Sequence, residues 1–277
     1  MKYSKTTKII FFTILALLSL VWIFPIIWAI FTSFKSNDEI IGSDFHLIPQ
    51  HWTTSNYAEL TADNEQTPVI KWFINSVIIS AGQTILVLVV VSLAAYGYTR
   101  LKFKGRDALF NCLLATMMFP GVLNLIPNYK IIDMLGWTNT FLAVIVPGAA
   151  GVYNIFLVRQ FVIGIPYELD EAAIVDGANE WQIFRYVVLP LIRPALTVVA
   201  LFTFAGSWND FLWPSIVMTD VETMPITPGL QLLQGQYLTF PGVATAGALL
   251  ALLPMLLMYL FAQKYFMQAM ALNSGIK

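Results

Sequence analysis

Long apolar runs alternate with shorter polar segments along this chain. A helix needs about 20 mostly apolar residues to cross the hydrocarbon of a bilayer, and the runs are close to that length. Six transmembrane helices are predicted on this basis, at residues 9–34, 74–98, 109–126, 141–161, 195–213 and 243–261. Six crossings place both ends of the chain on the same side of the membrane.

The first apolar run is predicted to stay in the protein as a span. Basic residues precede it, as in a signal peptide, at Lys2, Lys5 and Lys8. However, the run is longer than the apolar region of a signal peptide, and no small-residue cleavage site lies near its end. Residues 1–8 are therefore assigned to an N-terminal segment and residues 9–277 to the transmembrane domain.

The longest charged passage in the second half of the chain, residues 165–194, lies between the fourth and fifth predicted spans. Pro166 suits the first position of a helix. Carboxylates follow where the positive end of the helix dipole stabilises them, at Glu168, Asp170 and Glu171. Gly177 is predicted to interrupt this helix, because glycine permits a sharp change of direction.

A second helix is predicted directly after Gly177. Asn179 and Gln182 have the spacing of a capping box. One face of this helix would be lined by Trp181, Phe184, Val188 and Leu191. Pro190 and Pro194 would then close it. The passage therefore predicts two helices joined at a glycine elbow.

The composition excludes an ordinary soluble domain. Of 277 residues, 58% are hydrophobic and 11% are charged, against roughly 45–50% and 25% in soluble domains. The mean hydropathy of +0.72 agrees, so lipid must be the solvent for much of the apolar surface. The net charge of −1, without a basic stripe interleaved with aromatic residues, argues against nucleic-acid binding.

Cysteine and histidine do not indicate a metal site. Cys112 is the only cysteine and lies within an apolar run, so no internal disulfide or zinc cluster can form, and we interpret it as a packing residue. His46 and His51 lie in the first polar loop, where we interpret them as solvated side chains.

The distribution of lysine and arginine predicts the orientation. With the N-terminus inside, twelve of the 15 basic residues lie on inner segments, namely Lys2, Lys5, Lys8, Arg100, Lys102, Lys104, Arg106, Arg159, Arg185, Arg193, Lys264 and Lys277. The outer segments hold only Lys35, Lys71 and Lys130. Both termini and residues 165–194 are therefore predicted to face the cytoplasm, where ATP is.

Two long polar loops are predicted on the outer side. Residues 35–72 are acidic and could be a plain connector or part of a surface for an external partner. Residues 214–242 are rich in proline and glycine but mostly uncharged. A structureless loop of this length is usually functional or disordered, and the low charge of this one favours an ordered segment.

From Glu171 to Pro194 the chain reads EAAxxDGAxxxxxFxxxxLPxxxP. This string resembles the EAA loop of permease subunits in ABC importers that work with an external binding protein; the alternative is an amphipathic loop on the membrane surface. In that family the EAA loop docks into a groove on the ATPase. The resemblance assigns docking to Glu171, Ala172, Ala173, Asp176, Gly177, Ala178, Phe184, Leu189 and Pro190. Arg185 and Arg193 could pair with acidic groups of the ATPase or face phospholipid heads.

The resemblance continues over most of the chain from the second span onward. Segments similar to the smaller permease of maltose-type sugar importers are Ala95–Arg106, Met117–Thr140, Ser207–Pro214 and Met224–Leu230, although Thr227-Pro228 departs from the usual valine. The resemblance implies an all-α, polytopic type I ABC importer permease with six spans in a bacterial cytoplasmic (inner) membrane. It also implies the partners, which are a second permease forming a heterodimer, two ATPase subunits, a periplasmic or extracellular sugar-binding protein and the sugar.

No constellation for catalysis is present. Neither histidine has a serine or cysteine placed with it, and the phosphate-binding pattern GxxxxGK[ST] does not occur. We therefore expect this chain not to be an enzyme and to bind no cofactor, with ATP and Mg²⁺ held by partner subunits.

Asp210 is the only acidic residue placed inside a predicted span, near the outer end of the fifth. Such a side chain should face protein or water. Asn209 and Asp210, flanked by Trp208 and Trp213, could line a sugar path, because sugars present hydroxyl edges and apolar faces. Alternatively, they cap the span and bond a neighbouring helix. Further polar candidates, which helix–helix contacts would also explain, are Asn154 and Asn124.

The predicted function is that of a permease subunit of an ATP-driven carbohydrate importer, with an oligosaccharide as the expected cargo. An importer of a non-sugar solute is an alternative, against which residues 207–214 argue. A stand-alone secondary transporter or channel would predict internal duplication or a ring of intramembrane charges, and the sequence shows neither. A membrane enzyme is disfavoured because no acid–base pair lies near an interface.

Overall fold

The computed structural model describes residues 4–62, 65–236 and 240–273, and every regular element within these residues is a helix. The predicted all-α fold is confirmed. Parts of both predicted termini, including Lys2 and Lys277, lie outside the described residues, as does the side chain of Lys264.

The chain divides into two compact units. Among the described residues, 4–62, 65–70, 229–236 and 240–253 form the first, and 71–228 and 254–273 form the second. The first unit contains α1 (Lys5–Ser33), α2 (Asn37–Ile41) and α3 (Ser55–Thr61), with parts of α14 (Ile226–Gln236) and α15 (Pro241–Asn273). Helix α14 lies in the loop 214–242, for which the sequence favours an ordered segment.

The end of α1 is fixed by Asn56 on α3. The Asn56 Nδ2 group donates hydrogen bonds to the carbonyl oxygens of Ser33 (2.9 Å) and Lys35 (2.8 Å). The Ser33 hydroxyl also lies 2.8 Å from the Tyr57 hydroxyl. These bonds satisfy carbonyl groups that the end of a helix leaves without an intrahelical partner. Along most of α1 the apolar side chains are exposed, as expected of a helix whose solvent is lipid.

The second unit contains most of the remaining helices. They are α4 (Val69–Thr99), α5 (Arg106–Ala115), the 3₁₀ helices Thr116–Met118 and Gly121–Asn124, α6 (Leu125–Met134), α7 (Leu142–Ile145), α8 (Val152–Ile163), α9 (Glu168–Val175), α10 (Glu180–Gln182), the π-helix Ile183–Val188, α11 (Leu189–Leu191), α12 (Arg193–Asn209) and α13 (Leu212–Val217).

Three helices among the described residues are individually long and apolar enough to cross a membrane: Lys5–Ser33, Val69–Thr99 and Pro241–Leu260. Two more crossings are obtained if each of two bent helix pairs is one span. The predicted count of six is therefore not reproduced.

Proline and glycine account for the difference. The third predicted span, residues 109–126, is not a single helix, because the chain turns by 97° between Arg106–Met118 and Gly121–Met134. Pro120 and Gly121 lie at this bend, and proline cannot donate a helical hydrogen bond.

The fourth predicted span, residues 141–161, consists of two short helices, α7 and α8. The turn between them contains Pro147, Gly148 and Gly151. Glycine also allows close packing here, because a Cβ on Gly148 would lie 1.9 Å from the Gln83 side chain of α4. An apolar run therefore does not guarantee an unbroken helix.

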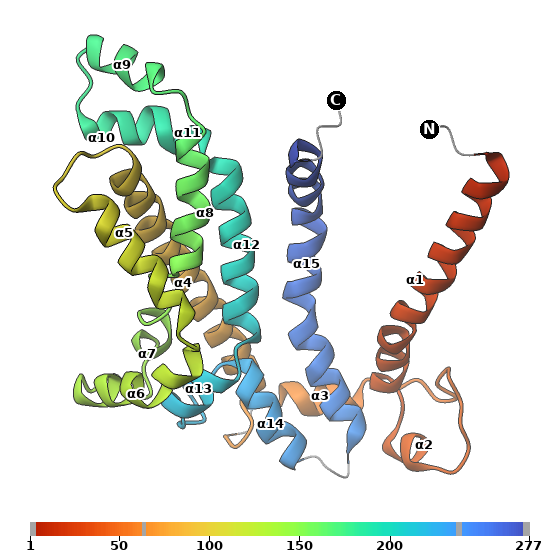
Figure 1. Ribbon diagram of the computed structural model, residues 1–277. Helices are drawn as coiled ribbons and strands as arrows, with labels where there is room; N and C mark the ends of the chain where they lie inside the picture. The colour runs from red at the N-terminus through yellow and green to blue at the C-terminus, as the bar shows by residue number, and fades with distance from the viewer. Residues whose placement is uncertain (1–3, 63–64, 237–239, 274–277) are drawn as a thin grey trace. The chain divides into compact units, whose positions relative to one another are not determined.

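A hydrophobic core holds the second unit together. Buried side chains come from α4 (Val91, Ala95), from α8 (Val158, Val162) and from the passage after Gly177, including Phe184. Helices α8 and α12 pack side by side (Figure 1). The polar passage between the fourth and fifth predicted spans is thus anchored in the same core as the spans.

The connections of the second unit gather at two opposite ends (Figure 1). The α4–α5 connection, α9 and α10 lie at one end, and α6, α7 and α13 lie at the other. Helix α13 contacts both α6 and α7. The basic residues 100–106 and the passage 165–194 therefore share one end, as the charge distribution predicts.

Candidate functional site

The predicted glycine elbow is present between α9 and α10. Gly177 has a φ of 84°, a left-handed conformation that favours glycine. The N–H of Ala178 donates to the carbonyl oxygen of Ala173, and the N–H of Gly177 donates to that of Ile174, both at 2.9 Å. This pair of bonds is a Schellman motif, which ends α9 and redirects the chain.

The predicted capping box is also present. The N–H of Asn179 donates to Gln182 Oε1 at 2.8 Å, and the N–H of Gln182 donates to Asn179 Oδ1 at 2.9 Å. These reciprocal bonds satisfy two backbone donors that would otherwise be unpaired at the start of α10. Both turns of the elbow are therefore fixed by local sequence.

Only two of the four side chains predicted to line one face of the second helix are buried. Phe184 and Val188 are buried, but Trp181 is 62% exposed and Leu191 is 49% exposed. For Leu191, which follows it, the reason is the π-helix Ile183–Val188. Its wider turns take more residues than an α-helix, so an α-helical spacing no longer stays on one face.

The helix Glu180–Leu191 ends one residue after Pro190, and Pro194 lies in the first turn of α12, where proline is tolerated. The two prolines thus flank the point where the chain turns, and Glu180–Leu191 and Arg193–Asn209 form an angle of 74°.

The candidate docking residues divide into an exposed and a supporting set. Glu171, Ala172, Asp176 and Gly177 are exposed, Ala173 and Ala178 are half-buried, as are Leu189 and Pro190, and Phe184 is buried. A shallow hollow of about 270 Å³ lies on the elbow, lined by Ala173, Asp176, Gly177, Ala178, Gln182, Tyr186 and Val187. The small side chains at positions 173, 177 and 178 leave the backbone open to close approach by another molecule.

Sequence reasoning missed an exposed apolar surface on the same elbow. Val175 is 87% exposed and Tyr186 is 73% exposed, with Ile174 and Trp181 also exposed. Exposed apolar side chains of this kind are typical of surfaces that bind another protein or the membrane. The signal in the sequence was the apolar pair Ile174-Val175 in an otherwise polar passage.

Helix α9 is the first arm of the elbow and α10 is the second, and an ion pair attaches the first arm to Arg100, the residue directly after α4. Arg100 Nε lies 2.6 Å from Asp170 Oδ2, and both side chains are buried, with 9% and 4% of their surface exposed. Arg100 also donates to the carbonyl oxygen of Ile165 at 2.8 Å. Burial raises the pKa of the Asp170 carboxyl, an effect that the Arg100 charge opposes and the Glu180 charge reinforces.

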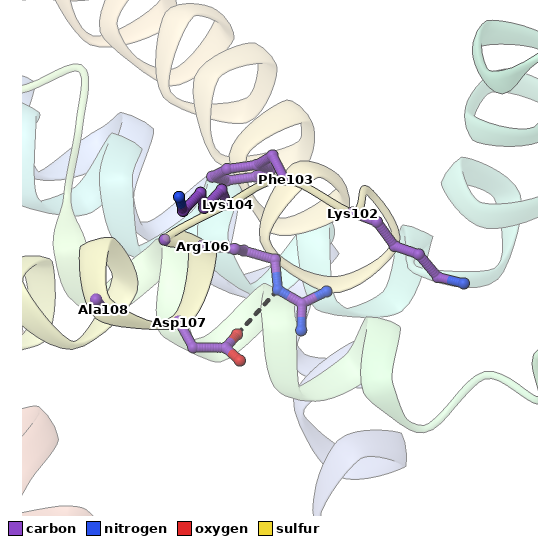
Figure 2. A pocket seen from close by; sticks show the side chains of 7 residues that line it. Lys102, Phe103, Lys104, Arg106, Asp107 and Ala108 are labelled. Carbon is purple, nitrogen blue, oxygen red and sulfur yellow. Dashed lines mark hydrogen bonds and ion pairs between the residues drawn. The ribbon is translucent and has the colours of Figure 1, made fainter.

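A basic hollow adjoins this attachment, between α4 and α5. Residues 102–108 line a shallow, open space of about 520 Å³. Figure 2 shows Lys102 and Lys104 pointing away from each other, and Arg106 forming an ion pair of 2.9 Å with Asp107. This loop is exposed and solvated. Together with Arg100, its three basic residues make four at this end of the unit.

The candidate sugar-path residues lie at the other end of the unit. Helix α12 ends at Asn209, so Asp210 lies just beyond the helix and not within it, which corrects the prediction. Asp210 Oδ1 accepts a hydrogen bond of 3.4 Å from the N–H of Trp213, in the first turn of α13. Asn209 donates to the carbonyl oxygen of Ala205 at 2.8 Å. Capping accounts for both residues, and a sugar contact stays a prediction.

The two tryptophans beside them are structural contacts. Trp208 is buried and packs against Phe73 and Phe204, with ring centroids 5.5 Å and 5.9 Å away. Trp213 donates through Nε1 to the carbonyl oxygen of Ala143 at 2.9 Å. In the described part of the chain, no hydrogen bond or ring contact joins Asn124 or Asn154 to residues 208–213.

Sequence reasoning also missed how the loop between α13 and α14 is held. Trp72 Nε1 donates to the carbonyl oxygen of Val221 at 2.6 Å, and Asn75 donates to those of Glu222 and Met224 at 2.9 Å and 3.1 Å. Residues 221–224 are therefore tied to the start of α4. Asn75 thus joins a helix to a loop.

Comparison with protein families gives one match that covers most of the chain. The model described as "Binding-protein-dependent transport system inner membrane component" matches residues 88–271. This range includes α9, the elbow and α12.

Several curated proteins are similar over nearly the whole chain. The diacetylchitobiose uptake system permease protein of Streptomyces coelicolor is 34% identical over 91% of this chain and 83% of its own length. The lactose transport system permease protein of Rhizobium radiobacter is 33% identical over 96% of both chains. The arabinooligosaccharides transport system permease protein of Bacillus subtilis is 32% identical over 94% of this chain and 92% of its own.

A solved structure has the same fold. A chain of a bacterial ABC transporter involved in the import of the acidic polysaccharide alginate superposes with a TM-score of 0.84, covering 96% of this chain and 99% of that chain. The two sequences are 23% identical. The architecture is therefore that of an ABC importer permease.

Proposed function

Since this chain belongs to the family of binding-protein-dependent transport system inner membrane components, we propose that it is one of two permease subunits in an ATP-driven carbohydrate importer. The observation that carries this proposal is the elbow between α9 and α10, which is exposed at its tip and anchored in the core at its base. Such a segment can bind another protein and transmit force to the helices behind it.

The proposed cargo is a carbohydrate, with an oligosaccharide expected. Three relatives at 32–34% identity are named for the transport of diacetylchitobiose, lactose and arabinooligosaccharides. These are sugars of two or more units, and the similarity extends over both the elbow and the outer segments.

The elbow is proposed to dock into a groove on an ATPase subunit. Glu171, Ala172 and Asp176 would meet the partner, together with the apolar side chains of Ile174 and Val175. Phe184 and Val188 would hold the elbow on the core. ATP and Mg²⁺ would be bound by two ATPase subunits, and this chain would supply half of the path for the sugar.

The remaining partners follow from the same proposal. A second permease would complete the path as a heterodimer, and a periplasmic or extracellular binding protein would deliver the sugar to the end that holds α6 and α13. The end with the elbow would face the cytoplasm, because the excess of lysine and arginine lies there. Closure of the ATPases would shift the elbow and re-pack the spans between two arrangements.

Single cysteines test both the orientation and the docking. Cys112 is exposed, so it is first replaced by serine, and Val175→Cys is then introduced at the elbow. A membrane-impermeant maleimide should label this cysteine in inside-out vesicles but not in intact cells. Co-expression of the ATPase should block the labelling, because the docked ATPase would cover Val175.

Asp133→Cys provides the matched control at the opposite end, since Asp133 is polar and exposed on α6. It should be labelled in intact cells whether or not the ATPase is present. Labelling of Val175→Cys from outside the cell would refute the proposal, and so would labelling that the ATPase leaves unchanged.

A further inference from the structure

Two side chains at the end of α4 contact the two arms of the elbow. Arg100 directly follows α4, and its N–H donates to the carbonyl oxygen of Tyr96 at 2.8 Å, so it continues the helical spacing and lies on the same face as Tyr96. Arg100 contacts Asp170 on α9, before Gly177, and Tyr96 contacts Glu180 on α10, after it. The sequence joins the elbow only to α8 and α12, so these contacts add a third helix to its support.

The Arg100 side chain is buried and makes several contacts with the first arm of the elbow and the residues before it. The ion pair with Asp170 is joined by the bond to the Ile165 carbonyl oxygen, and the guanidinium lies 5.5 Å from the centre of the Tyr167 ring. The planar guanidinium can satisfy several acceptors and a ring face together, which a lysine cannot do. Removing one member of a buried pair leaves the other charge without a partner, so α9 cannot move away from α4 without a penalty.

The Tyr96 contact fixes the second arm. Its hydroxyl donates to the Glu180 carboxylate (Oε2) at 2.5 Å and lies 3.2 Å from the carbonyl oxygen of Glu180. The Tyr96 ring packs against Phe184, with centroids 5.3 Å apart. Phe184 belongs to the core of the unit. The start of α10 is therefore held both by a polar bond and by ring packing.

We propose that Tyr96 and Arg100 are positioning residues that tie α4 to both arms of the elbow, so that a displacement of the elbow moves α4 together with α8 and α12. Because one residue holds α9 and the other holds α10, the pair also fixes the angle of the elbow. This proposal rests on the proposed docking of the ATPase. Without these contacts, ATP hydrolysis would continue while α4 no longer followed the motion of the loop.

The test uses the complete importer in proteoliposomes, with its ATPases, second permease and binding protein. Tyr96→Phe removes one hydroxyl and keeps the ring, and Asp170→Asn removes one charge of the buried pair. For each variant, the amount of ATPase bound, the rate of ATP hydrolysis and the sugar taken up per ATP are measured. We expect normal binding of the ATPase, with sugar taken up per ATP reduced about fivefold, the lower end of typical coupling effects.

Asp107→Asn is the matched control for Asp170→Asn, because it breaks an exposed ion pair, with Arg106, on the same side of the unit. It should leave the ratio of sugar to ATP unchanged. A purely structural role would lower transport and hydrolysis in the same proportion, and that result would overturn the proposal. An unchanged ratio in a well-assembled Tyr96→Phe importer would overturn it as well.

If the proposed function were wrong, the experiment would give a different result: the wild-type chain itself would bind no ATPase or transport no sugar. Should Asp170→Asn not fold, Tyr96→Phe alone decides the question, since it removes a single oxygen atom beside an intact ring contact.

Discussion

Asn139 holds the backbone of Thr219 in place across 80 residues of sequence. Its Oδ1 atom accepts hydrogen bonds from the N–H groups of Thr219 (2.7 Å) and Asp220 (3.0 Å), and its own N–H donates to the carbonyl oxygen of Val217 at 2.8 Å. Asn139 has a φ of 60°, and asparagine tolerates this left-handed conformation better than most residues. One side chain thus joins the α6–α7 turn to the loop between α13 and α14.

Replacement of Asn139 should separate these two roles. Asn139→Gly keeps the backbone conformation and loses the acceptor, whereas Asn139→Ala loses the acceptor and strains the backbone. We expect Asn139→Gly to lower the free energy of unfolding by about 1–3 kcal/mol, and Asn139→Ala to lower it by about 1 kcal/mol more. Denaturant unfolding in detergent measures both, and equal effects would show that the backbone conformation carries no strain.

Gly177 is the position at which a side chain should interfere with coupling. No atom lies within 4 Å of a Cβ built there, so only the backbone conformation resists substitution. Gly177→Val should therefore distort the elbow at a cost of about 1–2 kcal/mol. We expect binding-protein stimulation of the ATPase and sugar uptake to fall together, while the amount of protein in the membrane stays normal.

Two variants control for this effect. Gly177→Asn should retain more activity than Gly177→Val, because asparagine adopts the left-handed conformation more readily. Gly121→Val places the same side chain at a glycine that also has open space around it but has an ordinary φ. If Gly177→Val transports sugar normally, the elbow does not need its observed geometry.

The turns of the elbow could be predicted from sequence because their signals are local. Gly177 and the Asn179–Gln182 pair act on backbone groups within a few residues, and both motifs are present in the structure. The exposure of Val175 could not be predicted in this way. It depends on which face of α9 meets the core, and that is decided by Arg100, which lies 70 residues before Asp170.

Errors in the prediction of the spans have a related cause. Apolar composition measures whether lipid can surround a segment, and it says nothing about the direction of the backbone. Pro120 and Pro147 change that direction inside apolar runs, and the π-helix Ile183–Val188 changes which side chains share a face. The bends and the π-helix depend on backbone hydrogen bonds, and these cannot be read from the polarity of the residues.

Asn56 is expected to be the most sensitive polar residue of the first unit. Its Nδ2 group donates to two carbonyl oxygens at the end of α1, and its side chain is buried. Asn56→Ala removes both bonds, and we expect the free energy of unfolding to fall by about 2 kcal/mol, or about 1 kcal/mol for each bond. Asn111→Ala, which truncates an exposed asparagine on α5, should have little effect, and an equal loss in both variants would contradict this account.

Asp170 should make stability depend on pH in a direction opposite to that of an exposed ion pair. Burial raises the pKa of its carboxyl, so the folded chain binds the proton more tightly than the unfolded chain does. The resulting stabilisation is fully present below the pKa of the unfolded chain and is lost as the pH rises through the pKa of the folded chain.

Asp170→Asn has no proton to bind at this position, so comparison with the wild type isolates the effect. We expect the free energy of unfolding of the wild type, relative to Asp170→Asn, to decrease as the pH is raised from about 4 to about 7. Denaturant unfolding in detergent at a series of pH values measures this difference. An increase over the same range would mean that attraction to Arg100 outweighs burial and that the pKa of Asp170 is lowered, because the ionised pair would then stabilise the folded chain.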